Sequence, residues 1–160
     1  MFQDDLYNVV MLIPASKGYE TMEPVILQGH MDMVCEKVAG SAIDMEREGL
    51  QLAVDGDYVY AKDTTLGGDD GIAVAYMLAI ADDATIQHPP LEYIITVSEE
   101  VGMEGAGHID LSMLKGHCML NLDSEDEGIF LSSCAGGMSA IVTLPVVWVT
   151  APKKNWFTLK

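Results

Sequence analysis

The chain has 160 residues, 49% of them hydrophobic, and carries 25 acidic side chains against 8 basic ones, for a formal net charge of −17. Both nucleic-acid binding and attachment to an anionic membrane need clustered Lys and Arg, so this charge balance excludes those two classes of partner. The 3 cysteines have no CxxC spacing, so neither a disulfide framework nor a zinc knuckle is indicated.

The first half of the chain predicts strands followed by one apolar helix. We expect a strand from Leu6 to Ile13 and a buried strand from Val25 to Gln28. Residues 50–61 predict a hairpin, in which the Asp55-Gly56 pair suits a type I′ turn. Residues 71–84 are apolar on all sides, which predicts a helix packed deep against the sheet.

The second half continues the alternation of strands and helices. We expect a buried strand over residues 91–97, a short amphipathic helix over 107–117, a buried strand over 118–122 and a further strand over 139–149. Unbroken apolar runs are typical of parallel strands that are covered on both faces. The sequence therefore predicts an α/β fold with a mixed, mostly parallel sheet and flanking helices.

Groups able to bind a metal follow the predicted buried strands. They are His30 and Asp32, Glu99 and Glu100, and Asp123, with Asp69 just before the apolar helix. In open α/β sheets, ligands bind beyond the carboxyl ends of the strands. Because an isolated buried carboxylate is very costly, a shared divalent cation is the natural partner for these groups. Carboxylate and imidazole suit zinc, manganese or cobalt, and the chemistry predicted is metal-assisted hydrolysis.

Each of these groups also has a structural interpretation when it is taken alone. His30 and Asp32 fit a surface pair or a satisfied core imidazole, the Glu pair fits a solvated loop, and Asp123 fits a turn or a helix cap. Their joint occurrence at three strand ends favours the metal site. A calcium loop starting at Asp123 is excluded, because Cys134 stands where a bidentate Glu is required.

No membrane or secretion signal is recognisable in the sequence. The opening MFQDDLYNVV lacks a basic region followed by an apolar one, and the apolar run 72–81 is too short to span a bilayer. We therefore expect a cytoplasmic protein with no membrane partner.

Several motifs in order resemble one enzyme family. The strings VILQGHMDMVCEK, DGDYVYAKDTTLGGDDGIAVAYMLAI, EEVGMEGA and NLDSEDEGIFLSSCAGG are similar to the M20 metallopeptidases, and most closely to the aminoacyl-histidine (Xaa-His or β-alanyl-histidine) dipeptidases. The resemblance implies a zinc-dependent exopeptidase-like fold. It also implies hydrolysis of small Xaa-His peptides by water that two zinc ions activate, with manganese or cobalt as alternatives.

The resemblance also implies a role for each site residue. His30 and Asp123 would bind one zinc, Asp69 would bridge both ions, and Glu100 would bind the second. Asp32 would orient the ring of His30, and Glu99 would be the general base. The resemblance further implies that the peptide bond between Asp69 and Asp70 is cis.

The family pattern extends beyond this chain. Residues 1–147 would form a partial catalytic metal-binding domain, and residues 148–160 would begin a missing lid domain through which the parent enzyme forms a homodimer. A His ligand to the second zinc would also be missing, so we expect the truncated chain to be inactive alone. An N-acyl amino acid deacylase or amidohydrolase of the same family, or a non-catalytic metal-binding remnant, are the alternative functions.

Overall fold

The computed structural model describes residues 1–124, 126, 128–138 and 140–147. The chain divides into two units, Met1–Ile129 and Phe130–Lys160. All the helices and strands of the described residues lie in the first unit. None of these helices is long and apolar enough to cross a membrane.

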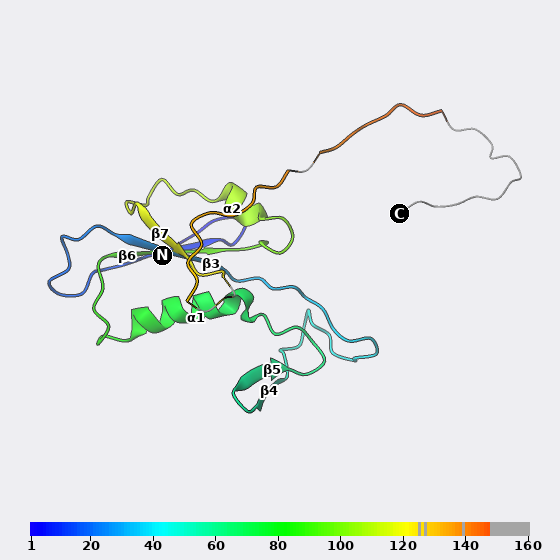
Figure 1. The fold of residues 1–160 in the computed structure, drawn as a ribbon, viewed down its shortest axis with the longest axis horizontal. Coiled ribbons are helices and arrows are strands. Elements are labelled where there is room, and N and C mark those ends of the chain that lie inside the picture. Colours follow the sequence, from blue (N-terminus) through cyan, green and yellow to red (C-terminus); the bar gives the residue numbers. More distant parts are fainter. Residues whose placement is uncertain (125, 127, 139, 148–160) are drawn as a thin grey trace, which may run out of the picture. The chain divides into compact units, whose positions relative to one another are not determined.

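A five-stranded sheet forms the centre of the first unit (Figure 1). Its spatial order is β1-β2-β6-β3-β7. The strands are β1 (Phe2–Gln3), β2 (Val9–Ile13), β6 (Leu91–Thr96), β3 (Val25–His30) and β7 (Cys118–Asn121).

The sheet is mixed, as predicted. Strand β3 pairs in parallel with β6 on one side and with β7 on the other, while β2 pairs antiparallel with β6 and with β1. Because β3, β6 and β7 are parallel, their carboxyl ends meet at one edge of the sheet. That edge receives the residues that follow His30, Thr96 and Asn121.

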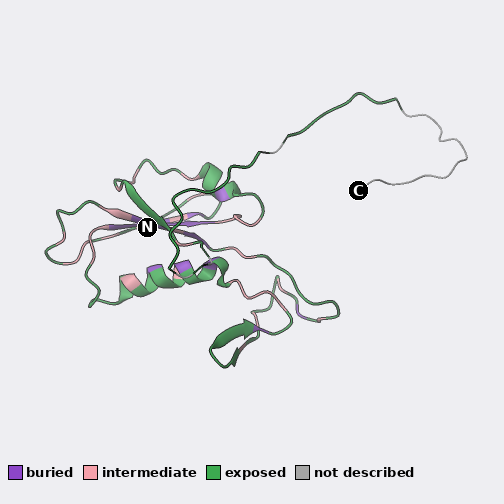
Figure 2. Ribbon diagram, viewed as in Figure 1, coloured by how far each residue is buried: buried purple, intermediate pink, exposed green. Residues whose placement is uncertain are grey.

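Strand β6 is the buried centre of the sheet. All six of its residues are buried, and Tyr93 and Ile95 pack with Leu27 of β3 in the hydrophobic core. Figure 2 shows the buried residues gathered on these central strands. The predictions of buried strands at β3 and β6 are confirmed.

Strand β7 differs from its prediction. It is a strand, but all four of its residues are exposed. It lies at the edge of the sheet, where β3 is its one partner among the strands that the structure describes. The prediction of a buried strand was wrong because an apolar run is buried only where other elements cover it, and the described residues of the first unit do not cover β7.

Helix α1 (Gly68–Asp82) packs on β3 and lies on the opposite side of the sheet from the short helix α2 (Glu104–His108) (Figure 1). Its residues Ala73 and Met77 are fully buried in the core, whereas Ile72, Tyr76 and Leu78 are at least half exposed. The helix packs against the sheet as predicted, but its outer face lies at the surface, so the prediction that it is packed deep instead of lying on the surface was wrong. An apolar outer face says nothing about whether a second layer covers it.

The predicted hairpin is present as β4 (Leu52–Asp55) and β5 (Tyr58–Ala61). The two loop residues are Gly56 and Asp57, and only Gly56 has a positive φ, of 58°. A type I′ turn requires positive φ at both residues, so that turn assignment was wrong.

The prediction of a short helix over residues 107–117 was also wrong. Helix α2 begins earlier and ends at His108, because Ile109 is extended at φ −64° and ψ 134°. The carboxylate of Asp110 then accepts the backbone N–H of Ser112 at 2.9 Å, a local turn that competes with a helix.

The C-terminal predictions have two outcomes. Residues 140–147, the described core of the strand predicted over 139–149, form no strand. Residues 148–160, predicted to begin a lid domain, lie outside the described residues.

Candidate metal centre

His30 is the last residue of β3 and the centre of the candidate site. Its side chain is 1% exposed, and its Nδ1 lies 3.0 Å from the carbonyl oxygen of Asp32. An Nδ1–H that donates to this carbonyl leaves the Nε2 lone pair free. Nε2 faces three carboxylates: it lies 3.1 Å from Asp69 Oδ1, 3.8 Å from Asp123 Oδ1 and 3.9 Å from Glu99 Oε2. A free imidazole lone pair among carboxylates is an arrangement suited to a cation.

Two adjacent aspartates at the start of α1 have different environments. The carboxylate of Asp69 is 57% exposed and points to the His30 ring. Asp70 is 1% exposed, and its Oδ2 accepts the backbone N–H of His30 at 3.1 Å. The peptide bond between Asp69 and Asp70 is cis, as the resemblance implied.

Gly29 makes the contact between α1 and β3 possible. A Cβ atom added at this position would lie 2.5 Å from Oδ2 of Asp70 and 2.6 Å from Cβ of Ala73. The helix therefore approaches the strand so closely that only glycine fits there. This approach brings Asp70 against the backbone of His30.

Asp32 connects β3 to the loop that follows β6. Its Oδ1 accepts the backbone N–H of Glu99 and its Oδ2 accepts that of Glu100, both at 3.2 Å. Its Oδ1 also lies 3.4 Å from Nδ1 of His30. Asp32 thus contacts the His30 ring and also holds the backbone of both glutamates.

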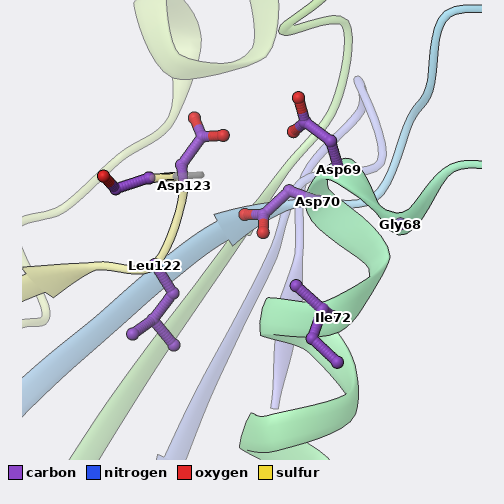
Figure 3. A pocket seen from close by; sticks show the side chains of 7 residues that line it. Gly68, Asp69, Asp70, Ile72, Leu122 and Asp123 are labelled. Atoms are coloured by element: carbon purple, nitrogen blue, oxygen red, sulfur yellow. The ribbon is translucent and has the colours of Figure 1, made fainter. Parts of the chain in front are cut away.

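Asp123 follows β7 and faces the start of α1 across a pocket of about 260 Å³. Figure 3 shows the carboxylates of Asp69, Asp70 and Asp123 at this pocket, with the apolar side chains of Ile72 and Leu122 along its lower part. The pocket therefore has an acidic end and an apolar end.

The carboxylates of the site are crowded. Burial raises the pKa of Asp123 to about 6, and the charge of Asp70 adds to the shift. Burial also raises the pKa of Asp70. Burial opposes protonation of His30, but the charge of Asp123 raises its pKa, and so does Asp69, whose carboxylate accepts a hydrogen bond from Nε2 when the ring is protonated. In the protein alone, these acids are therefore not fully compensated by positive charge.

The donor set fits a divalent cation. His30, Asp69 and Glu100 each place one ligand atom within 4.8 Å of the others, and His30, Asp70 and Asp123 do the same. Imidazole nitrogen with carboxylate oxygens is a donor set typical of zinc in hydrolytic sites. The structure thus brings together all six residues singled out from the sequence.

Three residues of the site region were missed in the sequence. Asp70 had been given no part in the site, although the tandem acids in GGDDG were a visible signal. Asn8, in the N-terminal segment, is hydrogen-bonded to Val97 and Gly105 at the two ends of the loop of Glu99, and Asp4 accepts a hydrogen bond from the Asn8 side chain at 2.7 Å. Nothing local in the sequence indicates that contact.

The chain is similar to named peptidases. No protein-family model matches it. Over 136 residues, or 85% of its length, it is 40% identical to the cytosol non-specific dipeptidase of Escherichia coli (strain K12), of which it spans 28%.

Solved structures agree with this relationship. The crystal structure of aminoacylhistidine dipeptidase from Vibrio alginolyticus matches 79% of the chain with a TM-score of 0.75 and 42% identity, and the chain covers 26% of it. Aminopeptidase PepT from Bacillus cereus ATCC 10987 matches 78% of the chain with a TM-score of 0.60 and 28% identity, and the chain covers 34% of it.

These relatives confirm the resemblance to dipeptidases and the α/β fold. The chain spans 28% of the E. coli dipeptidase and 26% of the Vibrio dipeptidase, so it corresponds to a fragment of either protein.

Proposed function

We propose that this chain is the metal-binding part of a dipeptidase that hydrolyses small peptides with a C-terminal His. The observation that supports the proposal is the convergence of carboxylates from three segments on the free Nε2 of the buried His30. The similarity to an aminoacylhistidine dipeptidase supports the choice of substrate. A protein named for cytosolic, non-specific dipeptide hydrolysis is among the relatives, so a cytoplasmic location is part of the proposal.

The proposed ligands are the residues that the resemblance indicated. His30, Asp69 and Asp123 would hold one zinc ion, and Asp69 and Glu100 would hold the second, with manganese or cobalt as alternative ions. Asp70 is close enough to His30 and Asp123 to take part. When bound, the metal pair supplies a Lewis acid that polarises the scissile carbonyl and makes water a better nucleophile.

In the proposed enzyme, Asp32 positions the site and Glu99 transfers the proton. Asp32 fixes the ring of His30 and, through the backbone N–H groups of Glu99 and Glu100, the start of the loop. The carboxylate of Glu99 is one-third exposed, so water and substrate can reach it. Glu99 takes a proton from the attacking water and passes it to the leaving amine, which would otherwise be a poor leaving group.

The experiment compares two adjacent substitutions in the full-length protein. Glu99→Gln should leave the metal content nearly unchanged and lower kcat by about 10²–10⁴-fold, the size expected for loss of a general base. Glu100→Gln should instead lower the metal content. Metal analysis beside kinetics on β-alanyl-histidine separates the two, and equal loss of metal in both variants would show that base and ligand are wrongly assigned.

Alternative substrates are tested on the same preparation. Turnover of N-acetylated amino acids without turnover of dipeptides would replace the dipeptidase with a deacylase. Turnover of dipeptides regardless of the C-terminal residue would refute the preference for His. Homodimerisation through a lid domain is also proposed, and light scattering on the full-length protein tests it.

A further inference from the structure

The amide of Asn8 joins both ends of the loop that carries Glu99 and Glu100. Asn8 directly precedes β2 and is 1% exposed. Its Oδ1 accepts the backbone N–H of Val97 at 3.1 Å, and its Nδ2 donates to the carbonyl oxygen of Gly105 at 3.0 Å. Val97 is the first residue after β6, and Gly105 lies in α2. One side chain therefore closes the base of the loop.

The loop itself is tightly bent. The backbone N–H of Gly105 donates to the carbonyl of Val97 at 3.2 Å, and that of Met103 donates to the carbonyl of Glu99 at 3.1 Å. Ser98 and Gly102 have positive φ, of 57° and 115°. A bend of this kind needs external contacts to hold one conformation. Asp32 supplies them at the middle of the loop, and Asn8 supplies them at its two ends.

Asp4 fixes the orientation of the Asn8 amide. Its Oδ2 accepts the second Nδ2–H of Asn8 at 2.7 Å, and its Oδ1 accepts the backbone N–H of Asn8 at 2.9 Å. The hydrogen bond from the Asn8 side chain lowers the pKa of Asp4, so the carboxylate stays charged. With both N–H groups and the oxygen used, the amide has one orientation that satisfies all its partners.

We propose that Asn8, held by Asp4, is a positioning residue that sets where Glu99 and Glu100 lie in the metal centre. The inference rests on the proposed function for its catalytic consequence. Its structural part, control of the loop, stands independently. Only a side chain that both donates and accepts can bridge Val97 N–H and Gly105 C=O, and neither aspartate nor leucine does so.

The test uses two variants of the full-length protein. One is an isosteric single substitution, and the other is a double variant in which positions 4 and 8 exchange their side chains. Asn8→Asp removes both donors and places a second carboxylate beside Asp4. The exchange variant Asp4→Asn/Asn8→Asp restores a hydrogen bond between the two side chains but still has no donor for Gly105 C=O. We expect kcat to fall by about 10–100-fold in both, with KM within about threefold, as for partners that orient metal ligands and catalytic groups.

A control variant separates positioning from stability. Glu92 is a buried residue near the other end of β6, where its carboxylate accepts the backbone N–H groups of Lys115 and Gly116 at 2.9–3.1 Å. Glu92→Gln should lower Tm and leave kcat at temperatures well below Tm unchanged. If Asn8→Asp does not fold, Asp4→Asn provides a milder change outside the core, with a smaller fall in kcat in the same direction.

Hydrogen exchange gives a readout that does not depend on activity. In Asn8→Asp, the protected amides of residues 97–105 should exchange at least about tenfold faster, while the β6 amides keep their rates. If kcat and loop exchange stay within twofold of the wild type, or if kcat recovers together with Tm in the exchange variant, the positioning role is refuted. If the wild-type protein hydrolyses no peptide, the proposed function fails, and loop exchange alone decides the role of Asn8.

Discussion

The close approach of α1 to β3 at Gly29 predicts a large effect from a single methyl group. In Gly29→Ala, the new Cβ would lie 2.5 Å from Oδ2 of Asp70 and 2.6 Å from Cβ of Ala73. Ordinary contacts between such atoms are about 3.5–4.0 Å, so α1 must move by roughly 1 Å. Neither neighbour has a long side chain that can turn away. We expect a cost near the upper end of the range for overpacking, about 2–3 kcal/mol of unfolding free energy.

Thermal unfolding followed by circular dichroism measures this cost. A loss of that size lowers Tm by roughly 4–12 °C in a domain of about 150–250 residues. The matched control is Gly71→Ala, because a Cβ at Gly71 has nothing within 4 Å. This change removes a helical glycine and should be neutral or stabilise by up to about 1 kcal/mol. If Gly29→Ala unfolds within about 0.5 kcal/mol of the wild type, the close approach of α1 to β3 does not constrain the fold.

Two further predictions concern charge. Removal of metal by a chelator should lower Tm, because an ion at 100 times its Kd stabilises the folded state by about 2.7 kcal/mol. An unchanged Tm after verified metal removal would contradict a metal site at His30. The folded-state pKa of Asp4 lies below its ordinary value of 3.8, so the contribution of the Asp4 carboxylate to folding stability is present above that value and is lost as the pH falls through the folded pKa. The Tm difference between wild type and Asp4→Asn should therefore be largest above about pH 5 and shrink below pH 3.8, and a pH-independent difference would contradict the charged hydrogen bond.

The sequence predicted the part of the site that depends on strand ends. The run around Tyr93 is apolar apart from Glu92 and Thr96, so a buried strand followed by Glu99 could be recognised from local pattern alone. The same holds for His30 after β3. Once the strands are parallel, their carboxyl ends must share an edge, and the convergence of these groups follows from topology.

The features that escaped prediction depend on distant partners. Asn8 is buried because of Val97 and Gly105, which are 89 and 97 residues away in the chain. Asp69 and Asp70, at the start of α1, have the same side chain, so their residue type does not distinguish the buried one from the exposed one. The backbone conformation decides that Asp70 is the buried residue. The exposure of Tyr76 and of β7 depends on what covers them, and hydropathy does not report that.

The strand order has a consequence for how the chain folds during its synthesis on the ribosome. Strands β2 and β3 do not pair with each other, because β6 lies between them. When β3 leaves the exit tunnel it has no partner, and it must wait while translation, at roughly 5–20 residues per second, reaches β6 and then β7. Asp123 emerges only after β7. In the proposed enzyme, the ligands His30, Asp69, Glu100 and Asp123 are therefore all present only after the last strand of this sheet has been synthesised, so the metal cannot bind all four while β3 still lacks its partners.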